Sequence, residues 1–114
     1  MSPDRFEGWL DDMRGAAQQA CGYVEGMTRE EFLNDSRTQQ AVAMNLLIIG
    51  EIAAKMIERY PERIARYPGI PWAGMKGLRN RIAHGYFEID MGVVWETVQR
   101  ALPDLVSYLE TRSD

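Results

Sequence analysis

Apolar residues recur every three or four positions along most of the chain, a spacing that is typical of helices with one buried face. The first stripe consists of Phe6, Leu10, Met13, Ala17, Ala20 and Val24. It predicts a helix that begins near Ser2, with Pro3 in the first helical position. Thr28 and Glu31 have the spacing of a capping box, which predicts a short helical turn through Leu33.

Two further apolar patterns predict the central helices. The second helix is predicted from Ser36 to Tyr60, and Pro61 marks its end. Two prolines and a glycine make residues 68–71 a loop, because they cannot continue a helix. The third helix is predicted over residues 72–84, with Gly85 as its C-terminal stop.

A fourth stripe follows Asp90, whose side chain can cap a helix that continues through Leu109. Pro103 lies inside this stripe and predicts a kink or a break there. No segment alternates between apolar and polar residues as a half-buried strand would. The sequence therefore predicts an all-α antiparallel bundle of four to five helices, with one domain over residues 1–114.

The composition places the chain among ordinary globular proteins. Of its 114 residues, 46% are hydrophobic and 26% are charged. Cys21 is the sole cysteine, which excludes an internal disulfide and a cysteine-based zinc cluster. The polar first ten residues and the short apolar run 46–49 predict neither a signal peptide nor a membrane span. We therefore expect a cytoplasmic protein.

The charge is unevenly distributed along the chain. The net charge is −4, but the segment 59–86 carries +5 and the remainder carries −9. The basic residues of that segment are Arg59, Arg63, Arg66, Lys76, Arg79 and Arg81. The net charge argues against a generic nucleic-acid coat, whereas the basic segment favours a local anion site, the alternative being chance clustering on a solvated helix face.

His84 is the only histidine, and it lies in the most basic part of the chain. Histidine suits proton transfer near neutral pH, although a single histidine is more often a surface or core residue. Arg79 precedes it by about 7.5 Å along a helix and about 140° around it, within reach of a shared phosphate. Asn80 lies one helical turn before His84, so the two side chains share a face and their spacing allows a hydrogen bond.

An arginine beside a histidine suits RNA cleavage without a metal. The 2′-hydroxyl would attack the adjacent phosphate, His84 would take its proton, and Arg79 would stabilise the charge on the phosphoryl oxygens. RNA and not DNA would be the substrate, because DNA lacks that nucleophile. A two-fold homodimer would bring two copies of both residues together and so supply a base and an acid.

Glu51 follows Gly50 within an apolar helical pattern, and both residues leave two interpretations open. Glu51 either orients Arg79 from across a cleft or forms an ion pair with Lys55 one turn away. Gly50 either allows a close approach of two helices or is a tolerated glycine that costs about 1 kcal/mol.

The three tryptophans also have two possible roles. Trp72 could stack on an RNA base, but packing beneath its loop is the favoured interpretation. Trp9 and Trp95 are expected in the core or in a dimer interface.

The segment from Arg79 to Tyr86 has the pattern Arg-x4-His-x-Tyr. In this pattern the chain resembles the HepT-like ribonuclease toxins of the HEPN superfamily, formerly a domain of unknown function. The similarity continues in order through residues 32–35, 40–42, 49–55, 70–72 and 89–90. It covers nearly the whole chain, with no departure at the motif positions.

The resemblance implies a HEPN-like helical homodimer that cleaves RNA with no metal and no cofactor. It implies Arg79 and His84 as the catalytic pair and Asn80 as a supporting polar residue. It also implies a toxin–antitoxin operon with a small nucleotidyltransferase (MNT-like) antitoxin that adenylylates Tyr86. The added anion would occupy Arg79 and Arg81 and block the cleft.

Two readings without catalysis remain. The first is a silent HEPN-type module that binds a nucleotide or docks a partner, and the second is a helical dimerisation adaptor. The acidic net charge favours these readings slightly. The complete set of Arg79, His84 and Tyr86 favours the enzyme, because a silent module needs no base beside a guanidinium.

Overall fold

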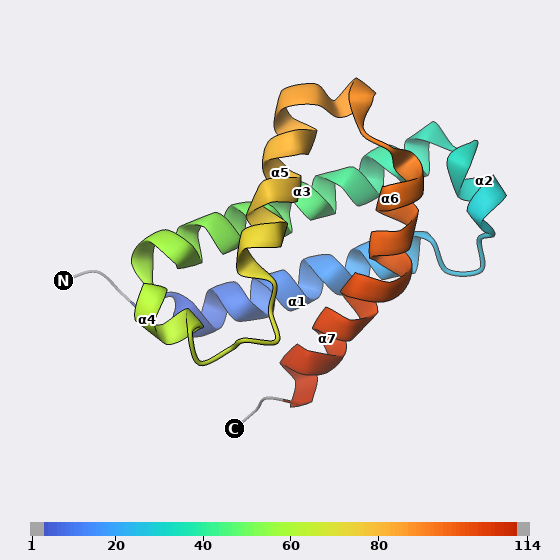
Figure 1. The fold of residues 1–114 in the computed structure, drawn as a ribbon. Helices are drawn as coiled ribbons and strands as arrows, with labels where there is room; N and C mark the ends of the chain where they lie inside the picture. The colour runs from blue at the N-terminus through green and yellow to red at the C-terminus, as the bar shows by residue number, and fades with distance from the viewer. Residues whose placement is uncertain (1–3, 112–114) are drawn as a thin grey trace.

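A computed structural model describes residues 4–111, and its regular structure there is entirely helical, with no strand among these residues. The long elements are α1, α3, α5 and a C-terminal helical stretch, with shorter turns between them (Figure 1). In chain order the elements are α1 (Phe6–Tyr23), α2 (Arg29–Leu33), α3 (Ser36–Arg59), α4 (Pro61–Ile64), α5 (Trp72–Gly85), the 3-10 turn η1 (Tyr86–Glu88), α6 (Met91–Glu96), the π-helical turn η2 (Thr97–Ala101) and α7 (Leu102–Thr111). The predicted all-α bundle is confirmed.

Side-chain caps begin three of these helices, and those at Thr28 and Asp90 were predicted. The Glu31 amide donates to Thr28 Oγ1 at 3.1 Å and the Thr28 amide donates to Glu31 Oε1 at 2.9 Å, which completes the capping box. The Asp35 carboxylate accepts the Thr38 amide at the start of α3. Asp90 accepts the Gly92 amide at 2.8 Å at the start of α6.

The predicted start of the first helix is wrong. Asp4 and Arg5 are not helical, and α1 begins at Phe6, whose amide donates to the Asp4 carboxylate at 2.9 Å. A carboxylate that satisfies an early backbone donor sets the helix start here, and an ion pair with Arg63 at 2.7 Å fixes that carboxylate. The predicted first position, Pro3, lies outside the described residues.

Gly85 ends α5 as predicted, but not through a left-handed conformation. Its φ is −162°, which is extended backbone, and the chain then continues as the turn η1. A positive φ occurs at one described glycine, Gly26. Gly85 therefore contributes a change of direction without the left-handed stop that many helix ends use.

The predicted disturbance near Pro103 takes the form of the π-helical turn η2, which joins α6 to α7 without a break. The Leu102 amide donates to the Thr97 carbonyl, five residues back. Proline has no amide hydrogen and its ring crowds the preceding turn, so a wider turn just before it accommodates the lost bond. The helix changes its pitch here and the chain goes on.

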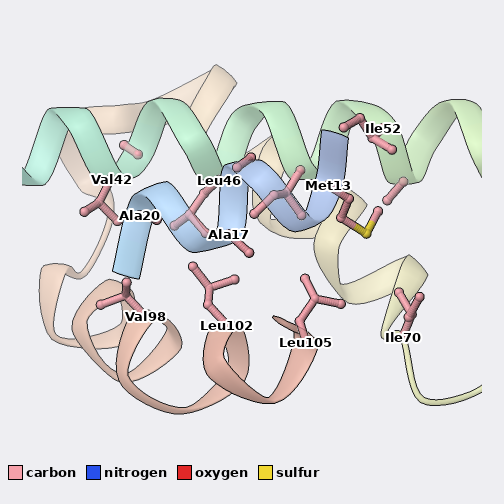
Figure 2. Packing of buried hydrophobic residues seen from close by; sticks show 14 of the residues in the cluster. Met13, Ala17, Ala20, Val42, Leu46, Ile52, Ile70, Val98, Leu102 and Leu105 are labelled. Carbon is pink, nitrogen blue, oxygen red and sulfur yellow. The ribbon is translucent and has the colours of Figure 1, made fainter. Parts of the chain in front are cut away.

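α3 is the central helix of the bundle. It packs against α1 and against α5, and α1 also contacts α7 (Figure 1). Figure 2 shows side chains from α1, α3, η2 and α7 meeting in one core, which includes Met13, Ala17, Val42, Leu46 and Leu105. The core thus unites helices that are far apart in the sequence and fixes the surface of α3 that faces α5.

α3 is also long enough and apolar enough to cross a membrane by length and composition alone, with a mean hydropathy of 1.4 over its best 18-residue window. Half of that window is buried inside the bundle. A helix packed between two others has the same composition for a different reason, since it must be apolar on two sides.

Candidate active site

α3 and α5 approach each other closely at Gly50. A Cβ atom placed on Gly50 would lie 2.6 Å from the Met75 carbonyl oxygen and would overlap the Cβ of Arg79. Only a residue without a side chain fits between these backbones. Of the two interpretations of Gly50, the close helix approach is therefore confirmed, and it places the stem of Arg79 directly against α3.

Arg79 is held at this crossing with one-quarter of its side chain exposed. Its Nη1 lies 3.6 Å from Glu51 Oε1, and its Nε is buried with no acceptor among the described residues. The ion pair is longer than a hydrogen bond, so the guanidinium keeps donors that can engage an anion. Packing fixes where Arg79 lies, and its hydrogen-bonding capacity remains available.

Glu51 contacts Arg79 and not Lys55. Among the described residues, Lys55 forms no ion pair with Glu51, and its Nζ lies 5.9 Å from the ring centroid of Trp9. The structure therefore selects the first of the two interpretations of Glu51, that of a carboxylate facing Arg79 from the neighbouring helix.

A groove of about 530 Å³ runs beside this pair, between α1, α3 and α5. Its walls combine apolar side chains with both members of the ion pair: Trp9, Asp12, Leu47, Ile48, Glu51, Ile52, Lys55, Arg79 and Ala83. Ile48 is 41% exposed, and Met44, one turn earlier on the same helix, is 56% exposed. The groove of Arg79 thus continues into an apolar surface of α3.

His84 lies next to this groove, at the exposed C-terminal end of α5. The hydrogen bond that this spacing allows between Asn80 and His84 is not formed within the described residues. Because His84 is exposed, a hydrogen bond to Asn80 would replace one to water and would gain little. Asn80 is half-buried and Arg81 is exposed, so these two supporting candidates lie on different parts of the helix surface.

Tyr86 follows α5 in the turn η1 and packs against the edge of the core. Burial raises the pKa of its phenol above the ordinary value, so the hydroxyl is neutral at physiological pH. Its ring meets that of Phe87 edge-on at 5.9 Å between centroids. Phe87 itself is 98% exposed, which is unusual for a large apolar side chain.

The basic run 59–86 is divided among the end of α3, α4 and α5. Two of its cations have carboxylate partners, since Arg63 pairs with Asp4 and Arg79 with Glu51. The run therefore contributes individual cations to several surfaces of the molecule.

Two of the tryptophans are structural. Trp72 is buried, and its Nε1 donates to the Tyr67 carbonyl at 3.3 Å, which confirms packing beneath the loop. Trp95 is buried against Phe32. Trp9 is half-buried and lines the groove of Arg79, a position that periodicity alone did not reveal. The sequence did contain one signal for this groove. Leu47 and Ile48 are adjacent apolar residues, more than one buried stripe of α3 requires, and both line the groove.

Comparison with known proteins gives a consistent result. The family model described as ribonuclease HepT-like matches residues 13–112. An RNase-named protein of Methanocaldococcus jannaschii is 36% identical over 102 residues, which are 90% of this chain and 82% of the relative. A Thermococcus cleftensis protein named as a probable ribonuclease HepT is 36% identical over 90% of both chains. No solved structure matches the chain.

The match extends over both helices that build the crossing of Gly50 and Arg79, and over the whole of the Arg-x4-His-x-Tyr segment. The chain belongs to the HepT-like ribonuclease family.

Proposed function

We propose that this protein is a metal-independent endoribonuclease and the toxin of a toxin–antitoxin pair, acting in the cytoplasm. The observation that carries the proposal is the position of Arg79. A close helix crossing and the Glu51 carboxylate hold its guanidinium, which keeps free donors and shares a helix with an exposed histidine.

In the proposed reaction His84 takes the proton of an RNA 2′-hydroxyl. The 2′-oxygen forms a bond to the adjacent phosphorus, and the bond from phosphorus to the 5′-oxygen breaks. Arg79 stabilises the charge that builds on the non-bridging oxygens. The products are a 2′,3′-cyclic phosphate and a 5′-hydroxyl, whose oxygen receives a proton from the second His84 of a dimer. Arg81 and Asn80 bind the phosphates on either side.

A homodimer is part of the proposal because one protomer offers only one imidazole. Exposed apolar side chains border the groove of Arg79, in particular Ile48 and Met44 on α3, and Phe87 lies just beyond His84. Two copies joined by this surface bury these side chains and place both His84 residues around one cleft.

Tyr86 is the proposed point of control by a nucleotidyltransferase antitoxin. The phenol oxygen would attack the α-phosphate of ATP, with pyrophosphate as the leaving group. The Tyr86 phenol is protonated near pH 7 and burial raises its pKa further, so the antitoxin must supply the base that removes its proton. The attached AMP would place a phosphate beside Arg79 and Arg81, where RNA must bind.

The test is cleavage of single-stranded RNA in EDTA by the wild type and by His84→Ala and Arg79→Ala. We expect losses of about 10²–10⁴-fold without the base and about 10²–10³-fold without the guanidinium. Arg66→Ala is the matched control, since it removes an exposed cation of the same basic run. It should cleave like the wild type and leave the same cyclic phosphate ends.

Equal activity in all variants would identify a contaminating nuclease and remove the support for the assignment. Failure of the unmodified wild type on several RNAs would favour the alternative, a HEPN-type module that binds a nucleotide or docks a partner without catalysis.

A further inference from the structure

Trp9 lies among three cations at the end of the molecule where α1 begins and α3 ends. Arg59 Cζ lies 5.7 Å and Lys55 Nζ 5.9 Å from its ring centroid. A hollow of about 320 Å³ is lined by these residues together with Arg5 and Glu58. We call it the Trp9 hollow; its lining carries three cations and one carboxylate.

The Trp9 hollow adjoins the groove of Arg79, because Trp9 and Lys55 line both. Glu51, Lys55 and Arg59 occupy successive turns on one face of α3, about 12 Å from first to last. Within the described residues, neither Lys55 nor Arg59 forms an ion pair. A path of basic and aromatic side chains therefore leads away from Arg79 along α3.

Both cations are held loosely at Trp9. Separations of 5.7 and 5.9 Å lie near the outer limit of about 6 Å for a cation–π contact. Long side chains at this distance can turn to an incoming phosphate at small cost. The Asp12 and Glu51 carboxylates line the groove of Arg79 but not the Trp9 hollow, where Glu58 is the one carboxylate beside three cations, so the hollow is the more favourable of the two for phosphates.

We propose that the Trp9 hollow binds the single-stranded RNA next to the scissile phosphate, with Lys55 and Arg59 on backbone phosphates and the Trp9 ring against a base. Flexible cations beside an aromatic side chain that is only partly buried, as Trp9 is, are the usual means of binding single-stranded nucleic acid without strict sequence preference. The inference rests on the proposed ribonuclease function and adds a second contact surface to it.

The experiment measures RNA binding apart from cleavage. A fluorescently labelled single-stranded RNA is titrated with His84→Ala protein, with and without the further pair Lys55→Gln and Arg59→Gln. We expect roughly tenfold weaker binding, and a slope of log affinity against log salt smaller by about 1.4, since each lost phosphate contact contributes about 0.7. Trp9→Phe, which keeps an aromatic ring in the core edge, should weaken binding about threefold, and Trp9→Ala by about tenfold.

A matched control removes two cations from a comparable groove elsewhere. Arg29 and Arg100 line a hollow of about 470 Å³ beside α2 and α6, at the opposite end of the molecule from α4 (Figure 1). Arg29→Gln with Arg100→Gln should change RNA affinity less than twofold. If both double variants lost RNA affinity equally, the loss would be due to net charge alone, and the inference would be overturned.

The remaining outcomes also decide the question. Unchanged affinity in the Lys55 and Arg59 pair overturns the inference, as does a His84→Ala protein that binds no RNA. A change of oligomeric mass in the Trp9 variants would assign the hollow to a second copy of the chain, which overturns it as well. Cleavage of the same RNA by the wild type is scored separately, so the ribonuclease proposal can survive when this inference fails.

Discussion

The two ends of the Arg-x4-His segment differ in how the fold holds them. Arg79 lies at a backbone crossing where Gly50 leaves no room for a side chain, and Glu51 faces it from the other helix. Five residues later, His84 is exposed, and Phe87 beyond it is almost entirely in solvent. The first end is built into the core of the protomer, and the second lies on its surface.

This difference indicates which part of the proposed site a single protomer can prepare. The position of the guanidinium depends on the packing of α3 against α5 and is complete when the chain folds. The imidazole has no hydrogen-bond partner among the described residues, and in the proposed dimer the second protomer or the RNA would orient it. Variants at the two ends should therefore fail in different ways.

The largest effect is expected from Ile48→Asp, which places a charge in the apolar surface of the proposed dimer. We expect a folded monomer whose RNA cleavage is reduced by about 100-fold or more, because an unpaired charge is costly at a buried interface. Sedimentation equilibrium and cleavage assays measure the two effects together.

Val93→Asp is the matched control, because Val93 is similarly exposed at 48% but lies on α6 beside a different groove. It should remain dimeric and active. A fully active Ile48→Asp monomer would show that each protomer has a complete site.

The second-largest effect is expected at the Arg79 end of the segment, where α3 and α5 cross. Gly50→Ala introduces a methyl group where the Arg79 stem and the Met75 carbonyl already lie, and overpacking of this kind costs about 1–3 kcal/mol. Urea denaturation measures the loss, and cleavage should fall as Arg79 is displaced.

Gly77→Ala, in α5, is its control, since a Cβ there meets nothing within 4 Å. It should stabilise the protein by about 0.5–1 kcal/mol through helix propensity. Equal stability of the two variants would mean that the crossing at Gly50 is looser than described.

A smaller effect is expected from Glu51→Gln, which keeps the shape of the side chain and removes its charge. Glu51 acts here as a positioning residue for Arg79, so kcat at saturating RNA should fall by roughly tenfold with little change in stability. Glu62→Gln makes the same charge change at an exposed carboxylate of α4 and should leave kcat unaltered. A rise in KM alone for Glu51→Gln would assign this carboxylate to binding.

The smallest effect lies far from both ends, at the cap of α3. Hydrogen bonds from the Thr38 hydroxyl and amide lower the pKa of Asp35 below its ordinary 3.8. Because the pKa of Asp35 is lower in the folded than in the unfolded protein, its ionised carboxylate stabilises the fold at pH values above the unfolded pKa. This contribution is lost as the pH falls through the folded pKa. The melting temperature of the wild type should therefore fall below about pH 4, and protonation of Asp35 should account for part of that fall.

Asp35→Asn can still cap the helix but cannot titrate. Its melting temperature at pH 7 should lie within roughly 3–5 °C of the wild type, and its decline between pH 5 and pH 3 should be shallower. An identical decline in both proteins would place the acid sensitivity elsewhere, for instance at Asp4, whose pKa is also lowered.

Most of the helices could be predicted because their signals are local. The capping box at Thr28 and the cap at Asp90 depend on residues within one turn, and the stripes of α1 and α3 follow from their own spacing. The start of α1 was misplaced because the Asp4 carboxylate and its distant partner Arg63 determine it. A disturbance of the helix near Pro103 was predicted at the right place, but it is a π-helical turn and not a kink or a break.

The sequence by itself determined the all-α class, the approximate bounds of the helices and the presence of an arginine, a histidine and a tyrosine in the HepT-like pattern. Periodicity and motif spacing are properties of neighbouring residues, so they can be read without a fold. Only the tertiary structure decided that Gly50 brings α3 onto Arg79, that Glu51 turns to Arg79 instead of Lys55, and that Trp9 joins Lys55 and Arg59. These contacts join separate helices, and the crossing of those helices depends on the side chains of the whole core.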